Sequence, residues 1–582
     1  MSSRQGTGLF ALICGTALVA PSLVACGGDD GTSPADAGSP DARLEGFDQP
    51  DDWCPGSDHC AAGDGGRLFV GAAAKIYTPE ITETWTDLNG DSEWQSDEPY
   101  VDANNNGKFD AYWLFGGGRA ANSVKTDLEA RALVFREGDT EVALAYLDCT
   151  GLFGAGGDID ALVAGAKARV PELDHVIVGS THAHDAVDTL GLWGATALES
   201  GYNAAYNQRV QQAAIDAIVE AAGDLHEAEA HVATQLLLNT PGDPTSLTDQ
   251  WNKDIRDPVI FDPTLTIVRF ARADDPTQTI GTLVNWADHP EMSAFGPDNL
   301  QISSHFPHWF RDGVEHGTPS VPPGGADEPG IGGVTVYAQG AVGGQIGSIR
   351  GAPVPGPDGT PITESSHEKD QALGVNLARR TLELLRSDET VYTDLPLTYR
   401  TVQVAARLDN IGLQVAYLVG ILAPHAAVGY DPGQPLGEGN NPWLPFRATY
   451  FQIGPVGMVT MPGELHPELW VGGYDCSSWT WGYPCYDDTL PNLPDFDNAP
   501  APPYLRDLVL ANPGVEYPML LGLAHDYFGY IVPAYNYVLD DHNPYLDEAD
   551  GDHYEETYSL GPDVERHVVH PILQLVAARP GE

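Results

Sequence analysis

The segment His175-Val176-Ile177-Val178-Gly179-Ser180-Thr181-His182-Ala183-His184-Asp185 joins a short apolar run to a polar His-x-His end. The run His175–Gly179 predicts a buried strand. Side chains two positions apart on an extended segment point to the same side, so His182 and His184 are expected to face one cleft. Neutral imidazole suits zinc, which makes the pair a candidate metal platform. The alternative is a pair of histidines on a surface loop.

Strand and helix patterns alternate on both sides of this segment. Strands are expected at Ala132–Phe135, Val142–Asp148, Leu265–Phe270, Gly281–Trp286, Val334–Ala338 and Tyr450–Met461. Helices are expected at Ile159–Val170, Tyr202–Leu225 and Glu368–Leu385. We therefore predict an α/β fold at residues 66–582, a single large domain with mixed sheets, substantial parallel pairing and flanking helices.

The composition narrows the classes of partner. The chain has 582 residues, 42% of them hydrophobic, with 28 Lys and Arg against 83 Asp and Glu, for a formal net charge of −55. So acidic a surface repels phosphate backbones, which excludes nucleic acid as a partner. It also opposes adhesion of the folded domain to anionic lipid and suits a place outside the cytoplasm.

The N-terminus predicts export. Residues 1–25 have an apolar stretch too short to span a bilayer, which is typical of a signal peptide. Leu23-Val24-Ala25-Cys26 resembles a bacterial lipobox, so we expect lipidation at Cys26; the alternative is an ordinary secretory signal. Residues 26–65 are rich in Gly, Asp, Ser, Pro and Ala and predict a disordered tether. The expected location is the bacterial cell envelope, with a lipid anchor in the outer membrane or cell surface, or the secreted fraction.

The remaining cysteines fit an oxidising compartment. Cys54 and Cys60 lie six positions apart, and Cys476 and Cys485 lie nine apart, so each pair predicts a local disulfide. Cys149 ends an apolar strand and is expected to be a buried free thiol.

Further polar residues follow other predicted strands. His289 ends Asn285-Trp286-Ala287-Asp288-His289, Glu464 lies in Met461-Pro462-Gly463-Glu464, and Tyr530 lies in Gly529-Tyr530. A single His, Glu or Tyr at a strand end is usually structural. The residues alone do not select these three from 18 His and 83 acidic residues.

The chain resembles the neutral/alkaline ceramidase family, as a bacterial lipoprotein member that matches its N-terminal catalytic domain. The resemblance covers most of residues 67–560 and rests on Val70-Gly71, Ser180–His184, Asn285–His289, Tyr337-Ala338-Gln339-Gly340-Ala341-Val342-Gly343, Pro462-Gly463-Glu464, Gly529-Tyr530 and His553-Tyr554-Glu555. It implies one catalytic zinc bound by His182, His289, Glu464 and Tyr530. It also implies that His184 is an acid/base group, and that Tyr554 and, by a looser match, Arg256 steady the reacting carbonyl.

The implied chemistry is hydrolysis of an amide bond in ceramide or a related N-acyl lipid by zinc-activated water. Three departures from the family pattern put the substrate in question. Ile346 occupies the position of a family Ser, with Ser348 two residues later, so a serine-dependent step is not expected. His305 stands where the family has Asp, as a second-shell group, an extra ligand or an ordinary buried His. The C-terminal immunoglobulin-like domain of ceramidases is expected to be missing.

An acidic segment predicts a structural calcium ion. Asp87, Asn89, Asp91 and Glu98 take positions 1, 3, 5 and 12 of an EF-hand-like loop. Asp102, Asn104, Asn106 and Asp110 repeat its start at positions 1, 3, 5 and 9. The alternative is a solvated loop of Asx turns.

These observations predict a zinc-dependent, ceramidase-like amide hydrolase that meets the membrane through its lipid anchor. The main alternative is a non-catalytic, calcium-stabilised surface lipoprotein that keeps the fold and binds a ligand. A lactamase-like zinc hydrolase is disfavoured because Asp185-Ala186 breaks the His-x-His-x-Asp-His spacing of that family.

Overall fold

The structure is a computed structural model that describes residues 49–579 except 58, 61–64, 238–252, 255, 295, 297–298, 321–322, 348–352, 438 and 481–483. The expected signal peptide and Cys26 lie outside the described residues. Within them, the chain forms two mixed sheets with helices on their outer faces, so the predicted α/β class with flanking helices is confirmed.

The larger sheet has nine strands, and its main path runs β14-β10-β9-β7-β2-β4-β5-β6, with β18 paired to β7. In chain order these are β2 (Leu68–Ile76), β4 (Glu129–Glu137), β5 (Thr140–Leu147), β6 (His175–Ser180), β7 (His226–Leu236), β9 (Thr264–Arg272), β10 (Asp275–Trp286), β14 (Val334–Gln339) and β18 (Thr390–Tyr392). Only the end pairs β5·β6 and β10·β14 on this path are parallel. Antiparallel pairing prevails because short turns join β4 to β5 and β9 to β10.

The smaller sheet has the order β1-β19-β20-β21-β23. Its strands are β1 (Asp52–Cys54), β19 (Leu397–Arg407), β20 (Trp443–Ile453), β21 (Val456–Thr460) and β23 (Tyr517–Leu521). Two-residue strands pair elsewhere: β3 (Ser123–Val124) with β11 (Gln301–Ile302), β8 (Lys253–Asp254) with β15 (Gln345–Ile346), β12 (Gly317–Thr318) with β13 (Glu328–Pro329), β16 (Val354–Pro355) with β17 (Pro361–Ile362), and β22 (Glu464–Leu465) with β24 (Tyr530–Ile531).

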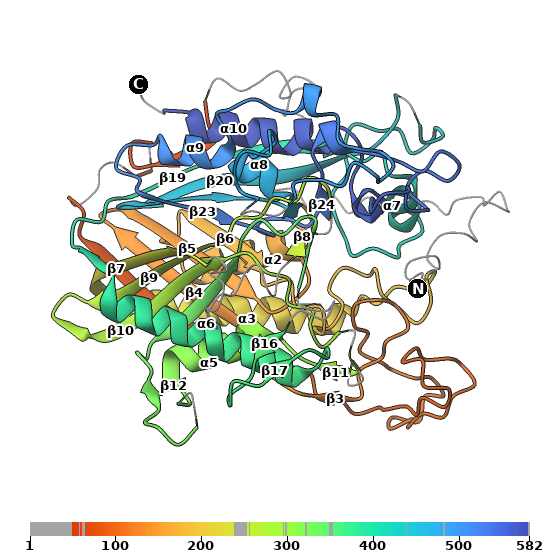
Figure 1. The fold of residues 1–582 in the computed structure, drawn as a ribbon, viewed down its shortest axis with the longest axis horizontal. Coiled ribbons are helices and arrows are strands. Elements are labelled where there is room, and N and C mark those ends of the chain that lie inside the picture. Colours follow the sequence, from red (N-terminus) through yellow and green to blue (C-terminus); the bar gives the residue numbers. More distant parts are fainter. Residues whose placement is uncertain are drawn as a thin grey trace.

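Helices cover the outer faces of both sheets (Figure 1). Against the larger sheet lie α2 (Asp158–Arg169), α3 (Ala204–Gly223), α5 (Phe306–His316) and α6 (His367–Ser387). Beside the smaller sheet lie α8 (Pro467–Val471), α9 (Leu505–Leu510) and α10 (His570–Ala577), while α7 (Ile411–Leu418) lies near one end of the molecule. Short helical turns span Phe496–Asn498, Ala534–Asn536, Tyr554–Tyr558 and Glu565–Val569.

The core between the sheets follows from strand alternation. On β4, Leu133 and Phe135 face the smaller sheet, whereas Ala132 and Val134 face the helices α2 and α3. Because both faces are covered, the strand is apolar at successive positions. The layer order is therefore helix, sheet, sheet, helix.

The ordered part of the chain begins before residue 66, which corrects the predicted end of the tether. Asp52–Cys54 forms β1, and its residue Trp53 lies opposite Arg400 of β19. The disulfide Cys54–Cys60 closes the next turn. Backbone hydrogen bonds to the sheet edge therefore order a segment whose Gly- and Asp-rich composition predicted disorder.

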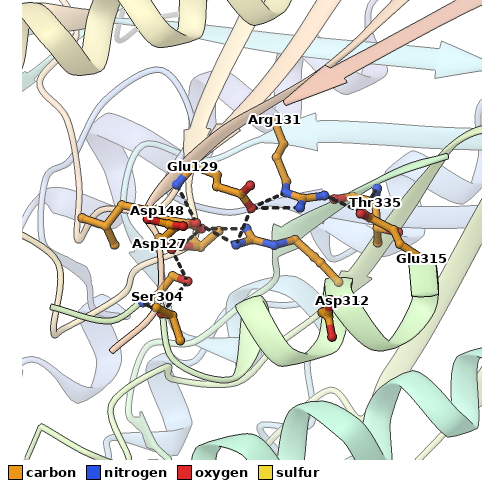
Figure 2. Close-up of polar contacts among 12 residues, drawn as sticks. Asp127, Glu129, Arg131, Asp148, Ser304, Asp312, Glu315 and Thr335 are labelled. Carbon is orange, nitrogen blue, oxygen red and sulfur yellow. Dashed lines mark hydrogen bonds and ion pairs between the residues drawn. The ribbon is translucent and has the colours of Figure 1, made fainter. Parts of the chain in front are cut away.

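A buried network of charges joins α5 to the larger sheet (Figure 2). Arg311 of α5 donates two hydrogen bonds of 2.7 Å to the carboxylate of Asp148, just after β5. Arg131 of β4 pairs with Glu129 and with Glu315 of α5. Asp148 also accepts a hydrogen bond of 3.3 Å from the Thr181 hydroxyl, directly before His182. The network thus reaches the first residue of the candidate site.

Candidate metal centre

His182 lies at the end of the edge strand β6 in a left-handed backbone conformation, with φ of 69°. Its side chain is 1% exposed, and its backbone N–H donates to the Cys149 carbonyl. Its Nδ1 lies 2.8 Å from the Thr150 carbonyl oxygen. A carbonyl only accepts, so Nδ1 carries a proton, and Nε2 is the nitrogen that could bind a metal ion.

Glu464, His184 and His289 lie around His182 Nε2. Glu464 Oε2 lies 3.3 Å from His182 Nε2 and 3.2 Å from His289 Nε2. His184 Nε2 lies 3.2 Å from His182 Nε2. Ligand atoms about 2.0–2.1 Å from a tetrahedral zinc stand about 3.3–3.4 Å apart. The spacing and the nitrogen and oxygen donors therefore fit a zinc ion.

The charges of these groups also suit a cation. Burial raises the pKa of Glu464, but His182 and His289 beside it outweigh burial and hold its pKa well below its usual range. Burial lowers the pKa of His184, and the neighbouring His182 and His289 lower it further. Burial lowers the pKa of His289 as well, but its hydrogen bond to Glu464 reverses the shift and leaves this pKa raised. The site thus presents a carboxylate beside neutral His184.

Gln339 connects the loops that carry His182 and His289. It ends β14, at the opposite end of the sheet path from β6. Its Nε2 donates to the Thr181 carbonyl at 3.3 Å and to the Asp288 carbonyl at 2.7 Å. Thr181 directly precedes His182, and Asp288 directly precedes His289. One fully buried amide therefore sets the positions of both histidines. The sequence offered only its place in the Tyr337–Gly343 motif as a signal.

Aromatic and charged side chains surround His184. The Phe115 ring stacks on its imidazole with the ring centroids 4.0 Å apart, and Glu291 Oε2 lies 3.6 Å from its Nδ1. Asp185, the next residue, accepts a hydrogen bond of 2.8 Å from Arg119 Nη2. Arg119 also donates to the Phe115 carbonyl, so it ties the stacked ring to the His184 turn.

His305 supports this turn. Its Nε2 accepts a hydrogen bond of 2.9 Å from the backbone N–H of Asp185, and its Nδ1 lies 2.9 Å from Asp370 Oδ2. Both ring nitrogens thereby have partners other than His182, His289 and Glu464. Of the roles open from the sequence, the contacts match a residue that holds the His184–Asp185 turn in place.

Three tyrosines lie near Glu464. Tyr530 is opposite Glu464 in the β22·β24 pair, and its hydroxyl lies 3.2 Å from that of Tyr554. Tyr527 donates a hydrogen bond of 2.8 Å to Glu464 Oε1. Burial raises the pKa of Tyr527, Tyr530 and Tyr554, so their hydroxyls are protonated. Sequence reasoning missed Tyr527, whose one signal was its place three residues before Tyr530.

Arg256 is tied to the Tyr554 segment. Its guanidinium is 2% exposed, with Nη1 2.9 Å from Glu555 Oε2 and Nη2 2.6 Å from Glu556 Oε1. These two glutamates directly follow Tyr554. A direct role at a reacting carbonyl, which the resemblance implies, would compete with these ion pairs.

Ile346, at the position of the family Ser, is a buried apolar side chain. Ile346 lies on β15, which pairs with β8, and is 6% exposed. Ser348 lies outside the described residues. The neighbouring Gly347 N–H donates to Glu291 Oε1 at 2.7 Å. No serine hydroxyl is available from position 346.

The acidic segment 87–110 adopts Asx turns. Asn89 accepts a hydrogen bond from the N–H of Asp91, and Asn104 accepts one from the N–H of Asn106, each two residues on. These turns occur with or without a bound ion, and calcium binding stays a prediction. The two predicted disulfides are confirmed, and Cys149 is a buried free thiol whose pKa burial raises.

Comparisons with known proteins bear on the fold. No protein-family model and no curated protein matches the sequence. Among solved structures, the neutral ceramidase from Pseudomonas aeruginosa is 14% identical, with a TM-score of 0.55 over 88% of this chain and 75% of that chain. A ceramidase complexed with C2 is 14% identical, with a TM-score of 0.54 and the same coverage. No described helix is both long and apolar enough to cross a bilayer. The two structural matches show that the chain has the fold of the neutral ceramidases.

Proposed function

We propose that the protein is a zinc-dependent hydrolase of amide bonds that acts on ceramide or a related N-acyl lipid. The observation that carries this proposal is the buried convergence of His182, His289 and Glu464, spaced as zinc ligands are. His184 joins the two histidines in a group that could hold a metal ion. The shared fold with the neutral ceramidases supports the same reaction class.

Bound zinc would supply a Lewis acid that polarises a carbonyl and lowers the pKa of water. Because His184 is neutral, its Nε2 can accept a proton and pass it to the leaving amine. Glu291, near Nδ1, would stabilise the charged ring during this transfer. The protonated Tyr554 hydroxyl would donate a hydrogen bond to the reacting carbonyl oxygen. Arg256 would act indirectly, by holding the Tyr554 segment.

Two measurements test the proposal together: zinc per chain in purified protein, and hydrolysis of ceramides, N-acyl amino acids and short N-acyl amines. We expect one zinc per chain and amide cleavage, both lost in His182→Ala. His316→Ala is the control, because His316 is 72% exposed and lies on the far end of α5. Metal-free, inactive wild-type protein would instead support a non-catalytic ligand-binding lipoprotein, which the Ile346 substitution favours.

Either Tyr530 or His184 could be the fourth zinc ligand. We propose Tyr530, with His184 left for proton transfer. Tyr530→Phe should then weaken zinc binding, whereas His184→Ala should keep zinc and lose turnover. The reverse pattern would make His184 a ligand, as its 3.2 Å approach to His182 also allows, and would remove it from the acid/base role.

We also propose export and lipidation at Cys26, which the two disulfides support because such bonds persist in oxidising compartments. Mass spectrometry of the N-terminal peptide from membranes should find a diacylated Cys26. An unmodified peptide that begins elsewhere would contradict the anchor.

A further inference from the structure

The helix α7 is almost entirely apolar, with the buried Gln414 as its one amide side chain. It reads Ile411-Gly412-Leu413-Gln414-Val415-Ala416-Tyr417-Leu418, and Val419, Gly420, Ile421 and Leu422 follow. From Ile411 to Tyr430 the chain has no Asp, Glu, Lys or Arg, although its net charge is −55. A helix that is hydrophobic all round normally lies inside a large core or against a membrane.

One stripe of this helix faces solvent. Ile411 is 43% exposed, Leu418 48% and Val419 56%, and Val415 between them is partly buried. These positions are spaced i, i+4, i+7 and i+8, so they share one side of the helix. Gly412, Gln414 and Ala416 are buried on the other side. The helix also lies at the edge of the molecule (Figure 1). We name Ile411, Val415, Leu418 and Val419 the α7 stripe.

The inner side of the same helix adjoins the candidate metal centre. Leu413, Tyr417 and Leu422 line an apolar cavity of about 40 Å³ together with Tyr527. Tyr527 donates its hydroxyl hydrogen to Glu464. The α7 stripe and the cavity thus lie on opposite sides of the same helix, and Tyr527 links the cavity to Glu464.

Another exposed apolar side chain lies on a loop that is hydrogen-bonded to the segment after α7. Leu198 is 53% exposed on the loop whose Ser200 hydroxyl donates to the Ile421 carbonyl. These half-exposed side chains present a few hundred Å² at most, whereas stable protein interfaces bury roughly 1,200–2,000 Å². The area is too small for a stable dimer but sufficient for insertion into a lipid interface.

We propose that the α7 stripe docks the protein on a zwitterionic lipid surface. The absence of charge along the stripe suits an uncharged interface, whereas the acidic chain as a whole is repelled by anionic lipid. Docking would place the apolar cavity and the metal centre beside the lipid. The proposal does not depend on zinc or on hydrolysis.

Sedimentation with phosphatidylcholine vesicles tests it. The full chain carries Cys26→Ser in every sample, so that no lipid anchor contributes. We expect this protein to bind the vesicles. The Leu418→Ser/Val419→Ser variant should bind them at least about tenfold more weakly. Ile76→Ser/Val391→Ser is the matched control, since Ile76 is 56% and Val391 47% exposed elsewhere, and it should bind like the parent.

Further arms separate the alternatives. Added phosphatidylserine should weaken binding at low salt, and salt should restore it. His182→Ala should bind vesicles like the parent, so that loss of the hydrolase does not decide the result. The proposal is overturned if the parent does not bind, if the α7 variant binds as tightly, or if the parent is a dimer that the variant dissociates. Equal circular dichroism and melting temperature would show that the variant is folded.

Discussion

Tyr527 provides a direct test of the metal centre, because one atom can be removed from it without changing its shape. Its hydroxyl donates a hydrogen bond of 2.8 Å to Glu464 Oε1, while Glu464 Oε2 faces His182 and His289. Both partners are buried. Tyr527→Phe would leave one oxygen of an ionised, buried carboxylate without its donor.

The size of the effect follows from this geometry. A hydrogen bond to a charged group contributes about 1.5–3 kcal/mol. If that energy holds Glu464 in its ligand position, the zinc dissociation constant should rise about 10- to 150-fold in Tyr527→Phe. This agrees with the effect of removing a partner of a metal ligand in other zinc sites, about 10- to 100-fold.

The assay is zinc competition against a chelator of known affinity, at fixed pH and ionic strength. Tyr206→Phe is the control. Tyr206 of α3 is also buried, but it packs against Tyr77 and Tyr112 and not against Glu464. It should leave the zinc affinity unchanged. A zinc affinity in Tyr527→Phe within about threefold of wild type would refute the claim that this hydrogen bond positions Glu464.

Two further predictions concern stability. Arg311→Met should lower the free energy of unfolding by about 3–5 kcal/mol because it leaves Asp148 buried without its partner, whereas Arg311→Met/Asp148→Leu should recover much of the loss. Urea unfolding measures both, with Lys75→Met in an exposed pair as the control at below about 1 kcal/mol, and additive losses would contradict the coupling. Burial lowers the pKa of His525 to about 3, so His525 contributes stability above its unfolded pKa of about 6.5 that is lost as the pH falls toward 3. Between pH 6.5 and 4.5 wild type should therefore lose about 2–3 kcal/mol more than His525→Asn, and parallel pH profiles would disprove this.

The predicted strands and helices agree closely with the structure where burial is strong. The patterns at 142–148, 175–179 and 202–225 correspond to β5, β6 and α3. Strand pairing was less well predicted, because hairpin turns rather than crossovers join several neighbours. The short strand β1 was missed, since its order comes from pairing with Thr401, Arg400 and Tyr399 of β19, far along the chain.

The candidate site was only partly accessible from the residues. The His-x-His pair stands out because its spacing is local. His289 and Glu464 have no local signal, and the family resemblance supplied them. Tyr527 and Gln339 were missed because a tyrosine or a glutamine at a strand end is common. The structure shows their importance through hydrogen bonds to residues more than 60 positions away.

The sequence by itself determined the order of strands and helices, the two local disulfides and the acidic character of the surface, because these depend on neighbouring residues and composition. Only the tertiary structure decided that His182, from one end of the sheet path, meets His289, which Gln339 holds from the other end. It also decided that Arg256 pairs with glutamates and that α7 turns an apolar stripe to solvent. Such contacts depend on how distant segments pack, which residue periodicity does not encode.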